Sequence, residues 1–264
     1  MKQSLSCAAI AVTPEITLYH TGPALDLGPL PSVFYFSLSG PDSLCRDPYN
    51  QPVQFLAGKM IRVFSLTLPA HEDPLSPEDA LNCWAQDFAN GRDCLKIFRD
   101  QVQMAVDFAI QKKFADPERI AAAGLSRGVL AAAFAAAENP RFRFLLGFAP
   151  LIKLGLAKEF SHLQHHPLLL AYDAIAIAAP LANRTIRFYI GNRDTRVSTK
   201  ACFDFTMAVV EKAHLAHIRS PQVELIISPS VGRMGHGTSP EIFRQGVAWL
   251  EQNLTLQKSS QNLF

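Results

Sequence analysis

The fold of this chain is decided by the stretch Arg119-Ile120-Ala121-Ala122-Ala123-Gly124-Leu125-Ser126-Arg127-Gly128, which continues as an alanine-rich run to Glu138. The apolar first half predicts a short buried strand, and the alanine-rich run predicts a helix. Between them the pattern Gly-x-Ser-x-Gly predicts a sharp turn centred on Ser126. Gly124 and Gly128 have no side chains, so the strand and the helix can pass close to each other at this turn.

A serine at such a turn is suited to nucleophilic chemistry. A hydroxyl is a poor nucleophile unless it is held exposed and within reach of a base. The helix that follows directs its free N–H groups towards any oxyanion that forms at Ser126. The same five-residue pattern also arises in ordinary glycine-rich turns, but here the strand before it and the helix after it favour a nucleophile elbow.

Length and composition restrict the class of protein. With 264 residues, of which 48% are hydrophobic, the chain can form one large α/β domain or two small ones with a substantial core. The formal charge of +2 and the lack of any Lys/Arg run give no indication of a nucleic-acid partner. No apolar run reaches the ~18 residues that a membrane span needs. We therefore expect no nucleic-acid partner and no membrane span, and the serine motif predicts a small-molecule ester or acyl substrate instead.

The cysteines and the first residues of the chain indicate the cellular compartment of the protein. The five cysteines are odd in number and show no C-x-x-C pairing, which predicts free thiols rather than a disulfide framework or a zinc site. Residues 1–12 are mildly apolar but carry a single Lys and are soon followed by Pro14 and Glu15, which argues against a signal peptide. Both features lead us to expect a cytoplasmic protein.

Apolar runs that resemble strands alternate with helix-like segments along the chain. The predicted strands cover residues 16–19, 33–38, 60–68, 119–125, 142–148, 185–191 and 223–227. The predicted helices run from a Ser76-Pro77 start to Lys113 with breaks at Asn90-Gly91, from 127 to 138, from about 199 to 217, and onward from Ser239-Pro240-Glu241. This alternation predicts a mostly parallel sheet covered on both faces, with its active site at the carboxyl ends of the strands.

Two further residues that follow predicted strands are of the types that an activated serine needs. Asp194 comes after the strand at 185–191, and His236 lies in a glycine-rich loop after the strand at 223–227. An activated serine needs a base, and the base needs an acid that fixes its tautomer. The chain order Ser126, Asp194, His236 therefore predicts a catalytic triad.

Over residues 33–254 the chain resembles the α/β-hydrolase superfamily, whose triad has this order. The segment Asp116-Pro117-Glu118-Arg119-Ile120 leading into the serine motif is most similar to the dienelactone-hydrolase and prolyl-oligopeptidase-like branch. The resemblance implies a single α/β-hydrolase domain over residues 1–264, with a mostly parallel twisted sheet, helices on both faces and a small cap. It also implies that Ser126 is the nucleophile, His236 the general base and Asp194 the orienting acid.

Other interpretations of these residues remain open. Asp194 lies between Arg193 and Arg196 and is also compatible with an ordinary solvated acid, while His236 is compatible with a loop histidine without a role. Asp173 and Asp204 are weaker candidates for the acid, because neither follows a strand directly. The histidines at 162, 165 and 166 lack a carboxylate pattern such as H-E-x-x-H, so we expect loop or capping residues and no metal or organic cofactor.

An oxyanion hole needs two N–H donors. The resemblance implies that one is the backbone of Arg127 and that the other lies in the loop after the strand at 33–38. This loop often reads His-Gly in the family, whereas here it reads Ser39-Gly40-Pro41. Proline cannot donate, so the second donor is Ser39 or Gly40, with Leu38 also open.

Substrate-contacting residues are less well defined. Arg127 and Arg233 adjoin the predicted triad and are candidates for binding an acidic substrate group, although such arginines more often pair with local acids or face solvent. Residues 151–183 form a cap-like insertion that is too short for a large lid. Their apolar stretches at 168–170 and 174–179 either line a substrate pocket or complete the core.

The combined prediction is a serine hydrolase that cleaves carboxylic esters through an acyl-enzyme. One alternative is a prolyl-oligopeptidase-like peptidase acting on short peptides, which the lack of a propeller domain in this sequence disfavours. A second alternative is a non-catalytic binding protein that kept the fold, which the intact Ser, His and Asp disfavour.

Overall fold

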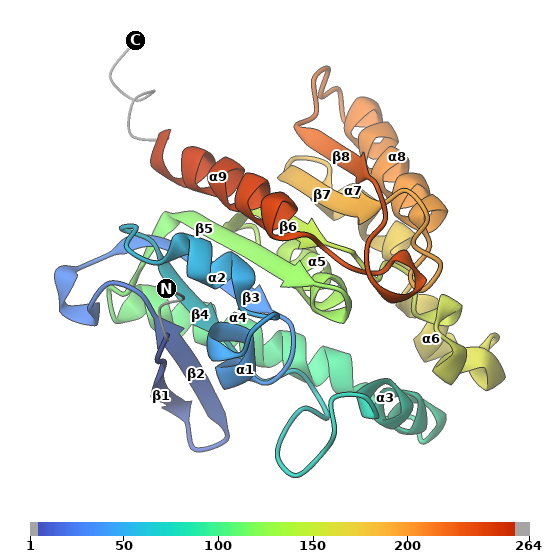
Figure 1. Cartoon of the computed structure of the whole chain (residues 1–264), viewed down its shortest axis with the longest axis horizontal. Coiled ribbons are helices and arrows are strands. Elements are labelled where there is room, and N and C mark those ends of the chain that lie inside the picture. The colour runs from blue at the N-terminus through green and yellow to red at the C-terminus, as the bar shows by residue number, and fades with distance from the viewer. Residues whose placement is uncertain (1–4, 257–264) are drawn as a thin grey trace.

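The computed structural model of the chain describes residues 5–256, which form a sheet with helices on both faces (Figure 1). The strands are β1 (Ala8–Thr13), β2 (Ile16–Thr21), β3 (Leu30–Phe36), β4 (Arg62–Ser65), β5 (Ala115–Leu125), β6 (Phe142–Phe148), β7 (Thr185–Gly191) and β8 (Val223–Ser228). Their order is β1-β2-β4-β3-β5-β6-β7-β8. β1 and β2 are antiparallel to their neighbours, whereas β4, β3, β5, β6, β7 and β8 are parallel.

The central strands are apolar on both faces because each face is covered. In β3, Phe34 and Phe36 belong to one hydrophobic core, while Val33 and Tyr35 belong to the core on the opposite face. Successive side chains of a strand point to opposite faces, so a strand that contributes to both cores reads as a continuous apolar run. This explains why the sequence predicted a strand here, although β3 covers Leu30–Phe36 and the prediction covered residues 33–38.

Different helices cover the two faces. The first core is closed by α3 (Ala80–Ala89), α4 (Cys94–Gln111), α5 (Arg127–Glu138) and α8 (Thr199–Leu215). The second core is closed by α1 (Gly40–Cys45), α2 (Gln51–Leu56) and α9 (Pro240–Leu256), and Figure 1 shows α2 and α9 on the same side of the sheet. The α/β-hydrolase fold expected from the sequence is therefore present.

Several elements differ from the expectation, among them the short helices α1 and α2, which the sequence analysis did not predict. The sequence analysis did not predict β1, an edge strand that lacks the alternation of buried and exposed residues typical of a half-buried strand. Residues 1–4 of the apolar start lie outside the described residues. The helix that the sequence predicts from Pro77 onward is α3, and it begins at Ala80. The chain at 76–79 forms a turn instead, in which the Asp79 N–H donates to the Ser76 carbonyl at 3.0 Å.

The strand expected at 60–68 is shorter than predicted. β4 ends at Ser65, after which the chain turns towards the loop that follows β3. The Leu68 N–H donates to the Leu38 carbonyl at 3.1 Å, so these two loops are joined at the carboxyl end of the sheet.

Residues 151–183 contain only short helical turns. These are η2 (Leu154–Leu156), η3 (Lys158–Leu163), α6 (Pro167–Ala171), η4 (Ala174–Ile177) and α7 (Ala178–Leu181). Leu169, Ala174 and Ala178 are buried in the first core, whereas Leu170 and Ile175 are exposed. The buried half of both apolar stretches completes the core, and the role of the segment as a cap stays a prediction.

In the part of the chain that the structure describes, no helix combines the length and the hydropathy that a bilayer-crossing segment requires.

Candidate active site

Ser126 occupies the turn between β5 and α5. Its backbone has φ 54° and ψ −119°, a conformation that residues with a side chain rarely adopt. A Cβ on Gly128 would lie 1.9 Å from the Phe36 carbonyl oxygen, and one on Gly124 would lie 2.5 Å from the Gly128 carbonyl. Both glycines are therefore required for the close approach of β3, β5 and α5.

Neighbouring segments hold the strained turn in place. The Ser126 N–H donates to the carbonyl of Phe148 at 2.8 Å, and the Leu151 N–H donates to the carbonyl of Ser126 at 3.2 Å. The backbone of the serine is thus fixed by the end of β6 and by the first residue of the segment 151–183.

The structure brings the three predicted triad residues together. Ser126 Oγ lies 2.9 Å from His236 Nε2, and His236 Nδ1 lies 2.8 Å from Asp194 Oδ2. The Asp194 side chain is fully buried, and its Oδ1 accepts the N–H groups of Arg196 and Val197 at 3.0 and 3.1 Å. Because this carboxylate accepts a hydrogen bond from the Nδ1–H group, Nε2 carries no proton and can accept the proton of the serine.

The loops that carry Asp194 and His236 are packed against each other. The Thr195 N–H donates to the Met234 carbonyl at 2.9 Å. A Cβ on Gly235 would lie 2.2 Å from the Arg193 carbonyl oxygen, so only glycine allows this contact. The histidine loop is therefore positioned by the aspartate loop.

The loop after β3 distinguishes among the candidate oxyanion donors. The Gly40 N–H donates to Thr67 Oγ1 at 3.0 Å, and the Leu38 N–H donates to Ser43 Oγ at 3.0 Å. Within residues 5–256, the backbone N–H groups of Ser39 and Arg127 make no hydrogen bond. Sequence reasoning missed Thr67, which reaches this loop from the distant segment after β4, and Ser43, which lies in the following helix α1, because no motif marks either contact.

The two candidate substrate arginines have different surroundings. Arg127 is half-buried, and its Nη1 donates to the Pro77 carbonyl at 2.7 Å. Burial, followed by the nearby positive charge of Arg196, lowers the pKa of Arg127 to about 10, so the side chain remains charged at neutral pH. Arg233 is exposed in the short turn η5 (Arg233–Gly235).

The remaining histidines do not join the triad. His71 is buried beside Trp84, and burial lowers the pKa of His71 to about 4. His166 caps α6 by accepting the Leu168 N–H at 3.3 Å, and His162 and His165 are exposed. Among the described residues no group of three His, Cys, Asp or Glu side chains is placed to hold a metal ion.

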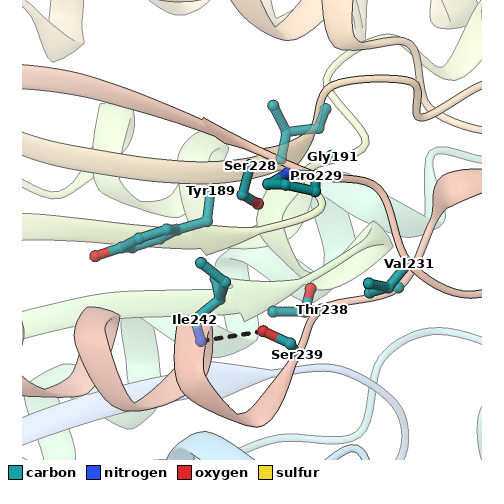
Figure 2. Close-up of a pocket in the computed structure, with 10 residues that line it drawn as sticks. Tyr189, Gly191, Ser228, Pro229, Val231, Thr238, Ser239 and Ile242 are labelled. Atoms are coloured by element: carbon teal, nitrogen blue, oxygen red, sulfur yellow. Dashed lines mark hydrogen bonds between the residues drawn. The ribbon is translucent and has the colours of Figure 1, made fainter.

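A pocket of about 240 Å³ lies beside the histidine loop, between the ends of β7 and β8 and the start of α9 (Figure 2). Figure 2 shows the hydrogen bond between two of its lining residues, in which Ser239 Oγ accepts the Ile242 N–H at 3.4 Å and caps the first turn of α9. Its lining carries no carboxylate, imidazole, thiol or basic group. We assign this pocket no chemistry.

The fold and the matched family define the class of protein as a serine hydrolase of the α/β-hydrolase fold. The model of the prolyl oligopeptidase family matches residues 85–256, a range that includes Ser126, Asp194 and His236. The chain therefore belongs to the prolyl oligopeptidase family. No curated protein sequence matches the chain.

Solved structures with the same fold include several hydrolases. TT1662 from Thermus thermophilus aligns with a TM-score of 0.69 and 16% identity, covering 96% of this chain and 99% of its own. The acylaminoacyl peptidase of Pyrococcus horikoshii aligns with a TM-score of 0.67 and 15% identity, covering 99% of this chain and 43% of its own. A cold-adapted esterase from an Arctic intertidal metagenomic library aligns with a TM-score of 0.65 and 15% identity, covering 96% of this chain and 95% of its own.

Proposed function

We propose that the protein cleaves carboxylic esters of small molecules through an acyl-enzyme, with Ser126 as nucleophile, His236 as general base and Asp194 as orienting acid. The observation that carries this proposal is the hydrogen-bonded chain from the buried Asp194 carboxylate through the imidazole to the serine hydroxyl. We also propose a reducing, cytoplasmic location, because an odd number of cysteines without a C-x-x-C pair favours free thiols.

The proposed reaction has two halves. His236 Nε2 takes the proton of Ser126 Oγ as the oxygen attacks the ester carbonyl, and the imidazolium returns that proton to the leaving alcohol. In the second half the same imidazole activates a water molecule, which hydrolyses the acyl-serine and releases the acid. The Asp194 carboxylate stabilises the imidazolium in both halves and keeps its own charge.

For the oxyanion we propose the N–H groups of Arg127 and Ser39. The engagement of the Gly40 N–H with Thr67 and of the Leu38 N–H with Ser43 favours Ser39 over both neighbours. Each such donor stabilises the transition state by about 3 kcal/mol.

Peptides are the second candidate substrate, favoured by the matched family and by the similarity to an acylaminoacyl peptidase. A panel of short p-nitrophenyl esters set against aminoacyl and prolyl p-nitroanilides separates the two candidates. A larger kcat/KM for the anilides would replace the ester proposal with the peptidase.

The triad proposal is tested by Ser126→Ala. We expect kcat for short p-nitrophenyl esters to fall about 10⁶-fold, because the nucleophile is lost. The exposed Ser220 offers a matched control, and Ser220→Ala should retain the parent rate.

A fluorophosphonate adduct mapped to Ser126 by mass spectrometry provides the second test. Hydrolysis by Ser126→Ala at the parent rate contradicts the assignment. Failure of the fluorophosphonate to label the folded protein favours a binding protein that kept the fold.

A further inference from the structure

The peptide group that joins Leu38 to Ser39 lies just after β3 and contains the Ser39 N–H, one of the two proposed oxyanion donors. Its carbonyl accepts the Leu68 N–H at 3.1 Å. Leu68 belongs to residues 66–79, the connection between β4 and α3, and its side chain is fully buried in the first core. An anchored neighbour therefore holds this carbonyl.

The direction of the carbonyl determines the direction of the Ser39 N–H. The Leu38–Ser39 bond is trans, and in a planar trans peptide the C=O and N–H bonds point in opposite directions. β3 lies between β4 and β5 in the sheet, and Leu68 follows β4, whereas Ser126 follows β5. A carbonyl directed towards the β4 side therefore places the Ser39 N–H on the β5 side, where the nucleophile lies.

The next peptide group, between Ser39 and Gly40, has the reverse orientation. The Gly40 N–H donates to Thr67 Oγ1 at 3.0 Å, towards the β4 side, and the Ser39 carbonyl accepts the Ser43 N–H at 2.8 Å. Two adjacent N–H groups thus point to opposite sides of β3. The Thr67 hydroxyl is the side-chain group that holds the Gly40 N–H on the β4 side.

The same connection also contacts the residue that supplies the other proposed donor. The Pro77 carbonyl accepts a hydrogen bond from Arg127 Nη1 at 2.7 Å. In the middle of the connection, the Pro69 carbonyl accepts from Trp84 Nε1 at 2.7 Å and from His71 Nδ1 at 2.9 Å. The connection is therefore fixed to α3 and contacts both sides of the proposed oxyanion hole.

We propose that residues 66–79 position the oxyanion hole, and that Thr67 is a positioning residue for the reaction. Its hydroxyl keeps the Gly40 N–H turned away from the substrate, and this leaves the Ser39 N–H turned towards it. The inference rests on the proposed esterase function. Because the substrate oxygen gains its charge in the transition state, a misdirected donor lowers kcat more than it changes substrate binding.

The test replaces Thr67 by valine, which removes the acceptor and keeps the shape of the side chain. Loss of a whole oxyanion donor costs about 10²- to 10³-fold in kcat, so we expect Thr67→Val to lower kcat for p-nitrophenyl acetate about 10- to 100-fold. KM should stay within about 2-fold of the parent value, because ground-state binding is unaffected. Thr67→Ser keeps the acceptor and should retain kcat within about 3-fold.

Thr206→Val is the matched control for a general loss of stability. Thr206 is buried in α8, and its hydroxyl donates to the Cys202 carbonyl at 2.8 Å. Thr206→Val therefore also removes the hydrogen bond of a threonine hydroxyl, but within a helix of the first core. It should retain the parent kcat even where its free energy of unfolding falls as far as that of Thr67→Val.

Inhibition by trifluoroacetophenone gives a second measurement that does not depend on turnover. The ketone adds to a nucleophilic serine, and the adduct oxygen carries a negative charge that the oxyanion hole stabilises. We expect the inhibition constant to rise about 10- to 100-fold in Thr67→Val, in parallel with the loss in kcat, and to stay unchanged in Thr206→Val.

The outcomes separate the positioning role from the esterase function. If the parent hydrolyses the ester and Thr67→Val retains both kcat and the affinity for the ketone, the positioning role is wrong and the esterase stands. Equal impairment of Thr67→Ser and Thr67→Val also contradicts the role of the hydroxyl. If the parent neither hydrolyses the ester nor binds the ketone, the proposed function fails and the positioning role fails with it.

A second variant decides if Thr67→Val does not fold. Arg127→Met removes the contact with the Pro77 carbonyl and keeps the backbone N–H of residue 127. We expect it to lower kcat for the same uncharged ester about 3- to 10-fold with little change in KM. An unchanged kcat would show that the connection does not position the oxyanion hole.

Discussion

Residues 119–138, which form the strand, turn and helix around Ser126, contact the segment 151–183. Different interactions determine the conformations of these two regions. In the turn, backbone contacts at Gly124 and Gly128 exclude any side chain. In the segment, no backbone contact of this kind occurs at Gly155, where a Cβ would find its nearest neighbour at 3.5 Å. The turn is therefore fixed by steric exclusion, and the segment by the burial of a few side chains.

The partners of those side chains explain why the segment was hard to predict. Tyr172 packs against Phe88 and Phe134 with ring centroids 5.4 and 4.9 Å apart, and its hydroxyl donates to Asp93 Oδ1 at 2.6 Å. All three partners are distant in the sequence, so no local period marks Tyr172 as buried.

The largest effect that tests this comparison is expected from Gly128→Ala. The new methyl would lie 1.9 Å from the Phe36 carbonyl oxygen. β3 contributes to both cores and α5 to the first, so neither element can move without disturbing packed side chains. We expect the free energy of unfolding to fall by about 4–5 kcal/mol in urea titrations, because the clash is with backbone that packed elements hold in place. Gly155→Ala is the control, with an expected change within about 0.5 kcal/mol. Equal losses in the free energy of unfolding for Gly128→Ala and Gly155→Ala would contradict the idea that steric exclusion fixes only the turn at Ser126.

An intermediate effect is expected from Leu169→Ala, which probes how firmly the segment is joined to the core. Leu169 is 4% exposed and its neighbour Leu170 is 60% exposed. We expect a loss of about 2–4 kcal/mol for Leu169→Ala and about 0.5 kcal/mol or less for Leu170→Ala, measured by urea unfolding. A negligible loss for Leu169→Ala would mean that the segment opens independently of the core.

The smallest effect is expected from Tyr172→Phe, which removes one hydroxyl and keeps the ring packing. Burial raises the pKa of Tyr172, and the hydroxyl serves as a donor to Asp93. We expect a loss of about 1–2 kcal/mol in the free energy of unfolding, since the acceptor is a carboxylate. Tyr49→Phe is the control, because the Tyr49 hydroxyl makes no hydrogen bond in the part of the chain that the structure describes. An unchanged midpoint for Tyr172→Phe would show that ring packing alone holds the segment.

The same contrast explains which parts of the fold and site could be predicted from the sequence. The elbow and the residues that follow β5, β7 and β8 obey local rules, so Ser126, Asp194 and His236 could be named in advance. The oxyanion donor could not be identified in this way, because the hydrogen bond of the Gly40 N–H depends on Thr67, which lies in the separate loop after β4.

The late start of α3 has a similar cause. The carbonyl of Pro77 accepts from Arg127, a contact between distant segments that the N-terminal pattern at Ser76-Pro77 cannot reveal. Local signals thus predict elements, whereas contacts between loops decide where those elements begin.

The hydrogen bond from Leu151 to the carbonyl of Ser126 has a consequence for engineering. Leu151, the first residue of the segment 151–183, is hydrogen-bonded to the backbone of the nucleophile, whereas the exposed turns after it make no such contact. A longer lid or a different recognition module can therefore be inserted at the exposed residues 164 and 165, provided that the buried Leu154, Phe160, Leu163 and Leu169 are kept together with the anchors Leu151 and Tyr172.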